Sequence, residues 1–228
     1  MAVRTKEEQV ADFLREGIIA GRFPRGARLK QQEIATLLQT SITPVREALK
    51  LLAAEGYVTG DPFRGATVAP FDLTASQETL SLRILLETQL VAAAVERATG
   101  DEIAELRELA EDFARAFAAG ENEAARASNY RFHHRMFEIA AMPQTLHFVQ
   151  ILWARYPFDL INRLEGRVSR AAGEHDLLVR AMAARDVTGA ILATREHIES
   201  GWLELRDVVA AAGAAHSAGG AARSRAAG

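Results

Sequence analysis

The sequence contains no cysteine and no long uninterrupted apolar run. Without cysteine the chain can form neither disulfides nor thiolate metal sites, and the simplest compartment for it is cytoplasmic. Because no run reaches about 18 apolar residues, we expect no membrane-spanning helix and no membrane partner. The N-terminal segment is charged and lacks the apolar core of a secretory signal, so no export signal is expected.

The chain also lacks a strong excess of either charge, which argues against a protein that coats nucleic acid over its whole surface. The 228 residues carry a formal net charge of −3, and their number favours two domains. Residues 1–70 hold ten Lys/Arg and eight Asp/Glu, whereas the remainder holds 17 and 22. This difference in the sign of the net charge favours an N-terminal part that contacts DNA and a C-terminal part with another function.

The first part of the chain, residues 1–71, has the pattern of a winged helix-turn-helix. Helices are predicted at 5–19, 31–38 and 43–55, with Thr5 and Thr43 as N-caps, Pro44 at the first position of the third helix and Gly56 after its end. In the second helix, Ile34, Leu37 and Leu38 are expected to face inward. Two β-prone runs, 57–59 and 66–68, flank turn residues and predict the hairpin that forms the wing.

From Asp72 onward the pattern is almost entirely helical. Helices are predicted at about 74–98, 101–119, 122–140, 144–156, 158–165, 168–184 and 186–211. Short connections between long amphipathic helices favour an antiparallel bundle over residues 72–211. The Ala/Gly/Ser-rich segment 212–228 is predicted to be a disordered tail. The fold class is therefore mainly α, with a winged helix-turn-helix followed by an all-helical bundle.

The third predicted helix carries the side chains suited to reading DNA. Arg46 is the best candidate for base recognition, because its guanidinium can bond both O6 and N7 of guanine. The other candidates can contact phosphates or the minor groove, and they are Arg28, Ser41, Thr43, Lys50 and Arg64 beside Gly65. Alternatively Thr43 is only a cap and Arg46 only a solvated charge. The wing after the two-helix unit favours DNA binding.

Four motifs in this region identify a family. They are G-x-F-x-x-G-x-x-L at 21–29, E-x-A at 33–35, S-x-T-P-V-R-E-A-L at 41–49 and L-x-x-E-G at 52–56. Together they resemble the winged helix-turn-helix of GntR-family transcriptional regulators. The resemblance implies a dimer on a short near-palindromic operator, with Arg46 and Thr43 among the contacts. Gln32 and Ile42 stand where the family commonly has arginine, and Gln32 joins the candidate contacts.

The predicted bundle contains histidines at spacings that suit a metal site. Asn129 and His133 lie four residues apart, on one face of a helix. His175 and His197 lie at similar distances before and after a tight turn, which puts them at one level of a helical hairpin. Three imidazoles and an amide oxygen could then converge on zinc, nickel, iron or copper. Spacing alone equally allows ordinary structural histidines, and we assign that role to His134, His147 and His216.

The bundle also resembles a known domain, the FCD effector domain of the FadR-type branch of the GntR family. The matching residues are R-x-x-L-E at 83–87, N-x-x-F-H at 129–133, the pair Glu174-His175, and His197. The resemblance implies a divalent metal, zinc or nickel first, held by Asn129, His133, His175 and His197. Asn129 replaces the usual aspartate. It also implies that Arg83 faces a cavity and binds a small carboxylate effector, whereas its local alternative is an ion pair with Glu87.

We therefore expect a ligand-responsive transcriptional regulator, a repressor acting as a homodimer, and not an enzyme. The alternative is a metal-dependent hydrolase that uses the three-histidine site. Against it, Glu174 and Glu196 each precede their histidine by one residue and point about 100° away around the helix. A third possibility, a constitutive architectural DNA binder, leaves the bundle unexplained.

Overall fold

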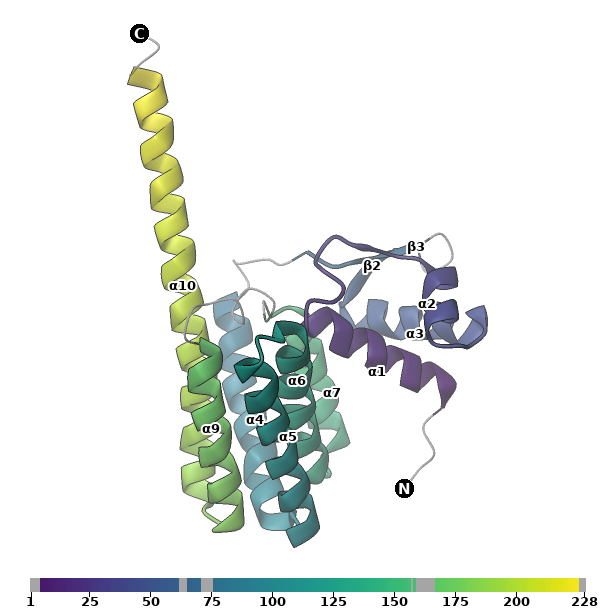
Figure 1. Ribbon diagram of the computed structural model, residues 1–228, viewed down its shortest axis with the longest axis vertical. Coiled ribbons are helices and arrows are strands. Elements are labelled where there is room, and N and C mark those ends of the chain that lie inside the picture. Colours follow the sequence, from purple (N-terminus) through teal and green to yellow (C-terminus); the bar gives the residue numbers. More distant parts are fainter. Residues whose placement is uncertain (1–4, 62–64, 71–75, 157, 159–166, 226–228) are drawn as a thin grey trace.

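The computed structural model describes residues 5–61, 65–70, 76–156, 158 and 167–225. The predicted fold class is confirmed: a helix-turn-helix unit with a small sheet lies beside one end of a helical bundle (Figure 1). The first helix, α1 (Lys6–Ile19), packs on the bundle helix α6 (Asn122–Ile139) and connects the two parts. Within the described residues, no helix combines the length and apolarity needed to cross a membrane.

Helix α1 begins where the sequence predicts. The Thr5 hydroxyl accepts a hydrogen bond from the Glu8 amide at 3.3 Å, and the Glu8 carboxylate accepts one from the Thr5 amide at 2.8 Å. This reciprocal capping box satisfies two amides that the helix itself leaves unpaired. The face formed by Val10, Leu14 and Ile18 is buried, as 3.6-residue periodicity requires.

Two details of the helix-turn-helix differ from the prediction. Helix α2 spans Gln31–Leu37 and α3 spans Ile42–Glu55, so Ser41 and not Thr43 occupies the N-cap position. Pro44 is consequently the third helical residue, where its missing N–H still costs no helical hydrogen bond. Leu37 is 60% exposed instead of buried, and Ala35 packs inward with Ile34. Gly56 ends α3 with a φ of 88°, as predicted.

The wing is present and is larger than predicted. Strands β2 (Val58–Asp61) and β3 (Gly65–Val68) form the expected antiparallel hairpin. A third strand, β1 (Arg28–Leu29), pairs with the other edge of β3 and gives the order β1-β3-β2. Two residues are too few for period-2 alternation, so the sequence could not reveal β1.

The bundle consists of α4 (Ser76–Arg97), α5 (Gly100–Ala118), α6, α7 (Pro143–Ala154), α9 (Arg167–Ala183) and α10 (Val187–Arg225). The helix predicted at 158–165 lies outside the described residues except for Phe158. Helix α10 continues to Arg225 and extends beyond the bundle, whereas a disordered tail is predicted from residue 212 (Figure 1). Alanine-rich sequence has high helix propensity, which accounts for the difference.

One hydrophobic cluster runs through both parts of the molecule. It includes Leu14 and Leu52 of the helix-turn-helix unit and Leu90, Phe132 and Met136 of the bundle, all fully buried. Polar contacts join the same two parts. Arg25 donates to the backbone oxygens of Ala154 and Tyr156, each at 3.0 Å, and to that of Ala69 at 3.2 Å. The Tyr57 hydroxyl donates to the Gln150 carbonyl at 2.9 Å.

A buried ion pair fixes α1 against α3. Arg15 donates from Nε and Nη2 to the Glu55 carboxylate at distances of 2.9–3.1 Å, and the side chains are only 5% and 10% exposed. Burial lowers the pKa of the Arg15 guanidinium, but the nearby Tyr130, Tyr57 and Glu55 outweigh it and raise the pKa overall. Arg15 therefore stays charged at all physiological pH values.

We expect the Arg15→Met variant to lose about 3–5 kcal/mol of unfolding free energy, because it leaves Glu55 buried without its cation. Urea unfolding followed by circular dichroism measures this loss. The double variant Arg15→Met/Glu55→Leu should recover most of it, since neither charge then remains buried. A loss below about 1 kcal/mol in the single variant would show that the pair does not fix α1 to α3.

Candidate functional site

The N-terminal half of α3 presents polar side chains to solvent. Ser41, Thr43 and Lys50 are exposed, and Arg46 is half-buried. Lys50 forms an ion pair with Glu47 at 2.9 Å, one turn earlier on the helix. In Figure 1, α2 lies at the side of the molecule farthest from the bundle, and α3 runs from that side toward the bundle. This surface is therefore open to a large partner such as duplex DNA.

The wing brings two further predicted DNA contacts together. Arg28 lies exposed on β1, and Gly65 begins β3 with a φ of +125°. A Cβ atom at Gly65 would lie 3.0 Å from Arg28 Nε, so glycine allows the guanidinium to lie flat against the strand. Gln32 is exposed on α2. Arg64 lies outside the described residues.

Inside the bundle, three helices bring three histidines together. His133 of α6, His175 of α9 and His197 of α10 each offer a ring nitrogen, and these nitrogens lie within 4.8 Å of one another. His133 Nε2 and His175 Nε2 are 3.2 Å apart. His175 is fully buried and His133 is 8% exposed. The structure places His175 and His197 at one level of the bundle, as the spacing argument predicts, and brings His133 to the same level.

Neighbouring side chains hold these imidazoles in place. The Glu174 carboxylate accepts a hydrogen bond from His197 Nδ1 at 2.6 Å, which leaves His197 Nε2 as the nitrogen with a lone pair. Ser200 donates to the same carboxylate at 3.4 Å. Phe132 stacks on His175 with ring centroids 4.4 Å apart, and Phe113 meets that ring edge-on at 4.8 Å.

The trio borders a small cavity that also contains Arg83. Two of the histidines, His133 and His197, line it together with Ile19, Arg83, Glu87, Asn129, Tyr130, Trp153 and Phe158. About 20 Å³ of it is open to a water-sized sphere, which is room for about one water molecule. A larger ligand can enter only if side chains around the cavity move.

Arg83 forms the ion pair with Glu87 and also borders the cavity, whereas its predicted role in binding an effector stays a prediction. Its Nε donates to Glu87 at 2.7 Å, and the guanidinium lies 4.0 Å from the centre of the Tyr156 ring. Burial lowers the pKa of Arg83, but the Glu87 carboxylate outweighs this and raises it overall. Trp153 donates to the same carboxylate at 2.8 Å. The Arg83–Glu87 ion pair thus forms the part of the cavity wall that α4 supplies.

The donor set can be tested against the geometry that a metal needs. Two nitrogens bound tetrahedrally at the usual zinc–nitrogen distance lie about 3.3 Å apart, close to the 3.2 Å between His133 and His175. Asn129 supplies a second observation. Its Oδ1 is buried and accepts no hydrogen bond from any described residue, although the side chain borders the same cavity as His133. Such an orphaned oxygen is available as a ligand. These residues fit a divalent metal.

Several residues of this site were not identified from the sequence. Tyr130, Trp153 and Phe158 complete the cavity wall around Arg83, and the Tyr156 ring lies against its guanidinium. Glu174 supports His197 on a different helix, although it points away from its own neighbour His175. The only sequence signal for Glu174 was its position beside His175, which says nothing about contacts across helices.

Known protein families match the two parts of this chain, the helix-turn-helix unit and the helical bundle, separately. Residues 6–68 match the model described as bacterial regulatory proteins, gntR family, and residues 78–200 match the FCD domain. The chain is 32% identical over 187 residues to the HTH-type transcriptional regulator McbR of Escherichia coli, covering 79% of this chain and 84% of McbR. The solved structure of E. coli McbR/YncC superposes with a TM-score of 0.77 at 28% identity, over 91% of this chain and 100% of that one.

A further relative is the Nta operon transcriptional regulator of Aminobacter aminovorans. It is 31% identical over 142 residues, 61% of this chain and 66% of that protein. These relatives are named as transcriptional regulators, and the hydrolase alternative has no support among them. The chain belongs to the GntR family of bacterial regulatory proteins, carries an FCD domain in its helical part, and is a DNA-binding transcriptional regulator and not an enzyme.

Proposed function

We propose that this regulator is a homodimeric repressor, which a small carboxylate releases from its operator by binding beside a metal in the FCD domain. The observation that carries this proposal is the convergence of His133, His175 and His197 next to the buried cation Arg83. In this proposal residues 1–71 contact DNA, residues 72–211 bind the effector and dimerise, and the protein acts in the cytoplasm.

The proposed metal is zinc or nickel, held by the three imidazoles with Asn129 as a fourth ligand. Imidazole nitrogens suit both metals, and positions left open by the protein would accept an oxygen of the effector. Glu174 supports this assignment, because a carboxylate bound to Nδ1 orients a histidine so that Nε2 is free to bind a metal. An amide oxygen is a weaker ligand than the usual carboxylate, so we expect modest affinity.

The proposed effector is a small organic acid. Its carboxylate would lie between the metal and Arg83, whose guanidinium can bond both oxygens. The cavity has room for about one water molecule, so the effector must favour a more open arrangement. Only this difference in affinity between the two arrangements can change DNA binding.

The proposed DNA target is a short near-palindrome, because a two-fold symmetric dimer presents two equivalent α3 helices. Arg46 would read guanine, while Thr43, Ser41, Lys50 and Gln32 contact phosphates or neighbouring bases. Arg28 and Gly65, with Arg64, would place the wing against the DNA backbone. Contacts to phosphates fix the position, and Arg46 supplies the sequence preference.

We expect the purified protein to bind one zinc or nickel ion per chain and the His175→Ala variant to bind none. Elemental analysis after metal loading and gentle dialysis measures this, and a rise in melting temperature on adding metal gives a second readout. His147→Ala is the matched control, because His147 is exposed and lies outside the trio. Equal metal content in the wild type and His175→Ala would rule out this site.

Two further variants test the proposed fourth ligand, Asn129, and the carboxylate of Glu174 that orients His197. Asn129→Asp should bind the metal about tenfold more tightly, or by about 1.4 kcal/mol, because a carboxylate adds charge at that position. Glu174→Gln should weaken binding about 10- to 100-fold, because the amide orients His197 less well. Isothermal titration with zinc checks both. Weaker binding by Asn129→Asp would show that residue 129 does not face the metal.

We expect Arg46→Ala to lose about 1–3 kcal/mol of operator affinity and to relax the preference at one base pair of each half-site. Fluorescence anisotropy on an operator selected from random sequence, with single-base variants, measures this change. Lys50→Ala is the control, which should weaken all sequences alike and lower the salt dependence by about one charge. If Arg46→Ala keeps the full base preference, Arg46 does not read bases.

The effector itself can be sought with a thermal-shift screen of carboxylates, run with and without zinc. A true effector should raise the melting temperature more in the presence of zinc, and it should lower the anisotropy of bound operator DNA. Neutral analogues in which an amide replaces the carboxylate are the controls. A screen in which no acid distinguishes the zinc-loaded protein from the metal-free protein would oppose the proposal.

A further inference from the structure

We propose that Ile42, the first residue of α3, recognises the C5-methyl group of a thymine in the operator. This inference rests on the proposed docking of α3 in the major groove, and it adds a base preference at a residue outside the contacts proposed above. Among the four bases of DNA, thymine alone presents a methyl group in the major groove. An apolar side chain that lies against the base edges therefore selects thymine.

Ile42 presents apolar surface to solvent at the start of α3. The residue is 36% exposed, and among the described residues it belongs to none of the hydrophobic clusters. The apolar residues of α3 that join the core, Val45, Leu49 and Leu52, lie further along the helix. Ile42 thus carries apolar surface that a bound partner can cover.

The residues around Ile42 suit an approach to DNA. Ser41 and Thr43 flank it and are exposed, and Arg46 follows one turn later on the same side of the helix. Between Glu33 and Glu47 the sequence has no acidic residue. This segment therefore brings no carboxylate toward the phosphates when its helix enters the groove.

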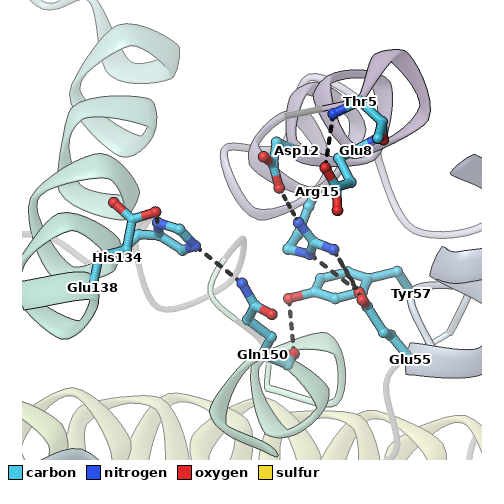
Figure 2. Close-up of polar contacts among 9 residues, drawn as sticks. All are labelled: Thr5, Glu8, Asp12, Arg15, Glu55, Tyr57, His134, Glu138 and Gln150. Atoms are coloured by element: carbon cyan, nitrogen blue, oxygen red, sulfur yellow. Dashed lines mark hydrogen bonds and ion pairs between the residues drawn. The ribbon is translucent and has the colours of Figure 1, made fainter. Parts of the chain in front are cut away.

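The opposite end of α3 is anchored, which gives Ile42 a defined position. Figure 2 shows two contacts there: Arg15 donates to the Glu55 carboxylate at 3.0 Å, and the Tyr57 hydroxyl donates to the Gln150 carbonyl at 2.9 Å. The residues that reach base edges in this class of protein are those at the N-terminal end of the second helix of the unit. The anchored end thus leaves the end that carries Ile42 to meet the bases.

The chemistry of isoleucine favours thymine over the other bases. Its β-branched side chain has one strongly preferred χ1 rotamer in a helix, so its methyl groups are held in place before DNA binds. Ordering it on binding also costs less side-chain entropy than ordering a lysine or arginine. Guanine, adenine and cytosine present only polar groups at this edge, and an isoleucine that covered them would leave them without hydrogen-bond partners.

The position of the thymine follows from the spacing along α3. Ile42 and Arg46 are four residues apart, which is a rise of about 6 Å along the helix axis. Successive base pairs are stacked about 3.4 Å apart. When α3 lies along the groove, the thymine at Ile42 is therefore about two base pairs from the guanine that Arg46 reads.

Replacing thymine by uracil removes the methyl group and leaves base pairing unchanged, which gives a direct test. Each thymine of an operator selected from random sequence is replaced in turn, and binding of the full-length protein is measured by fluorescence anisotropy. At one thymine, about two base pairs from the guanine, wild-type affinity should fall about fourfold for each half-site. This is about 0.8 kcal/mol, the contribution of one buried methyl group. Ile42→Ala should bind the thymine and uracil operators equally.

Leu51→Ala is the matched control, because Leu51 is an apolar residue of the same helix, 43% exposed and near its other end. It should keep the uracil sensitivity of the wild type. The salt dependence of affinity should be the same in Ile42→Ala and the wild type, because the contact involves no phosphate, and a change would contradict the proposal. Melting temperatures of the free variants check that each is folded.

The assignment is wrong if uracil weakens binding at no thymine, or if Ile42→Ala keeps the full uracil sensitivity. It is also wrong if only Leu37→Ala, which changes the exposed leucine at the end of α2, removes that sensitivity. Arg46→Ala separates these failures from a failure of the proposed docking. If Arg46→Ala changes the base preference while uracil has no effect, only the thymine contact is wrong. If neither variant changes any preference, α3 does not read the operator and both proposals fail.

Discussion

The orientation of α3, the helix proposed to contact DNA, depends on the buried ion pair between Arg15 and Glu55. Glu55 is the last residue of α3, and Arg15 lies in the third turn of α1, which packs on α6. An ion pair with so little water around it resists separation, because either partner alone would remain buried and charged. The C-terminal end of α3 is thus held toward the bundle. The opposite end, where Ser41 and Thr43 are exposed, points away from the bundle.

Local features of this fold could be predicted from the sequence because their causes are local. The Thr5 capping box, the glycine after α3 and the hairpin of the wing follow from residues within a few positions of one another. The same reasoning failed at Thr43, since Ser41 and Thr43 lie two residues apart and both carry a hydroxyl, so residue type does not choose between them. It failed at Leu37 because a seven-residue helix is too short for its periodicity to fix one face.

Contacts between side chains of different helices were harder to predict from the sequence. Counting residues from the turn placed His175 and His197 at one level, because antiparallel helices of equal rise keep step. Counting could not show that Glu174 reaches His197 or that Trp153 reaches Glu87. Such contacts depend on how far each helix is rotated about its axis, and the whole core determines that rotation. The cavity around Arg83 depends on the same rotations, which explains why its aromatic wall was missed.

Tyr130 connects the histidine cavity with the acidic region between the two parts of the molecule. Its side chain borders the cavity that His133 lines and also a second hollow, which is lined by Asp12 and Glu16 of α1 and by Glu138 of α6. Burial raises the pKa of its hydroxyl, partly opposed by Arg15, so this group stays neutral. A single aromatic ring therefore separates the cavity beside Arg83 from a hollow lined by four carboxylates and two guanidinium groups. A movement of the Tyr130 ring would therefore change the shape of both spaces.

The contacts of Arg25 determine how much freedom is lost when the protein meets DNA. Its guanidinium joins the last residue before Pro70, Ala69, to the end of α7. The helix-turn-helix unit is thus already held against the bundle where the connecting segment begins. A DNA-binding unit joined to the bundle only by a flexible linker would lose rotational freedom when it bound DNA, and this loss would reduce the binding free energy. Here most of that freedom is removed during folding, so the bundle sets the direction in which α3 faces a partner.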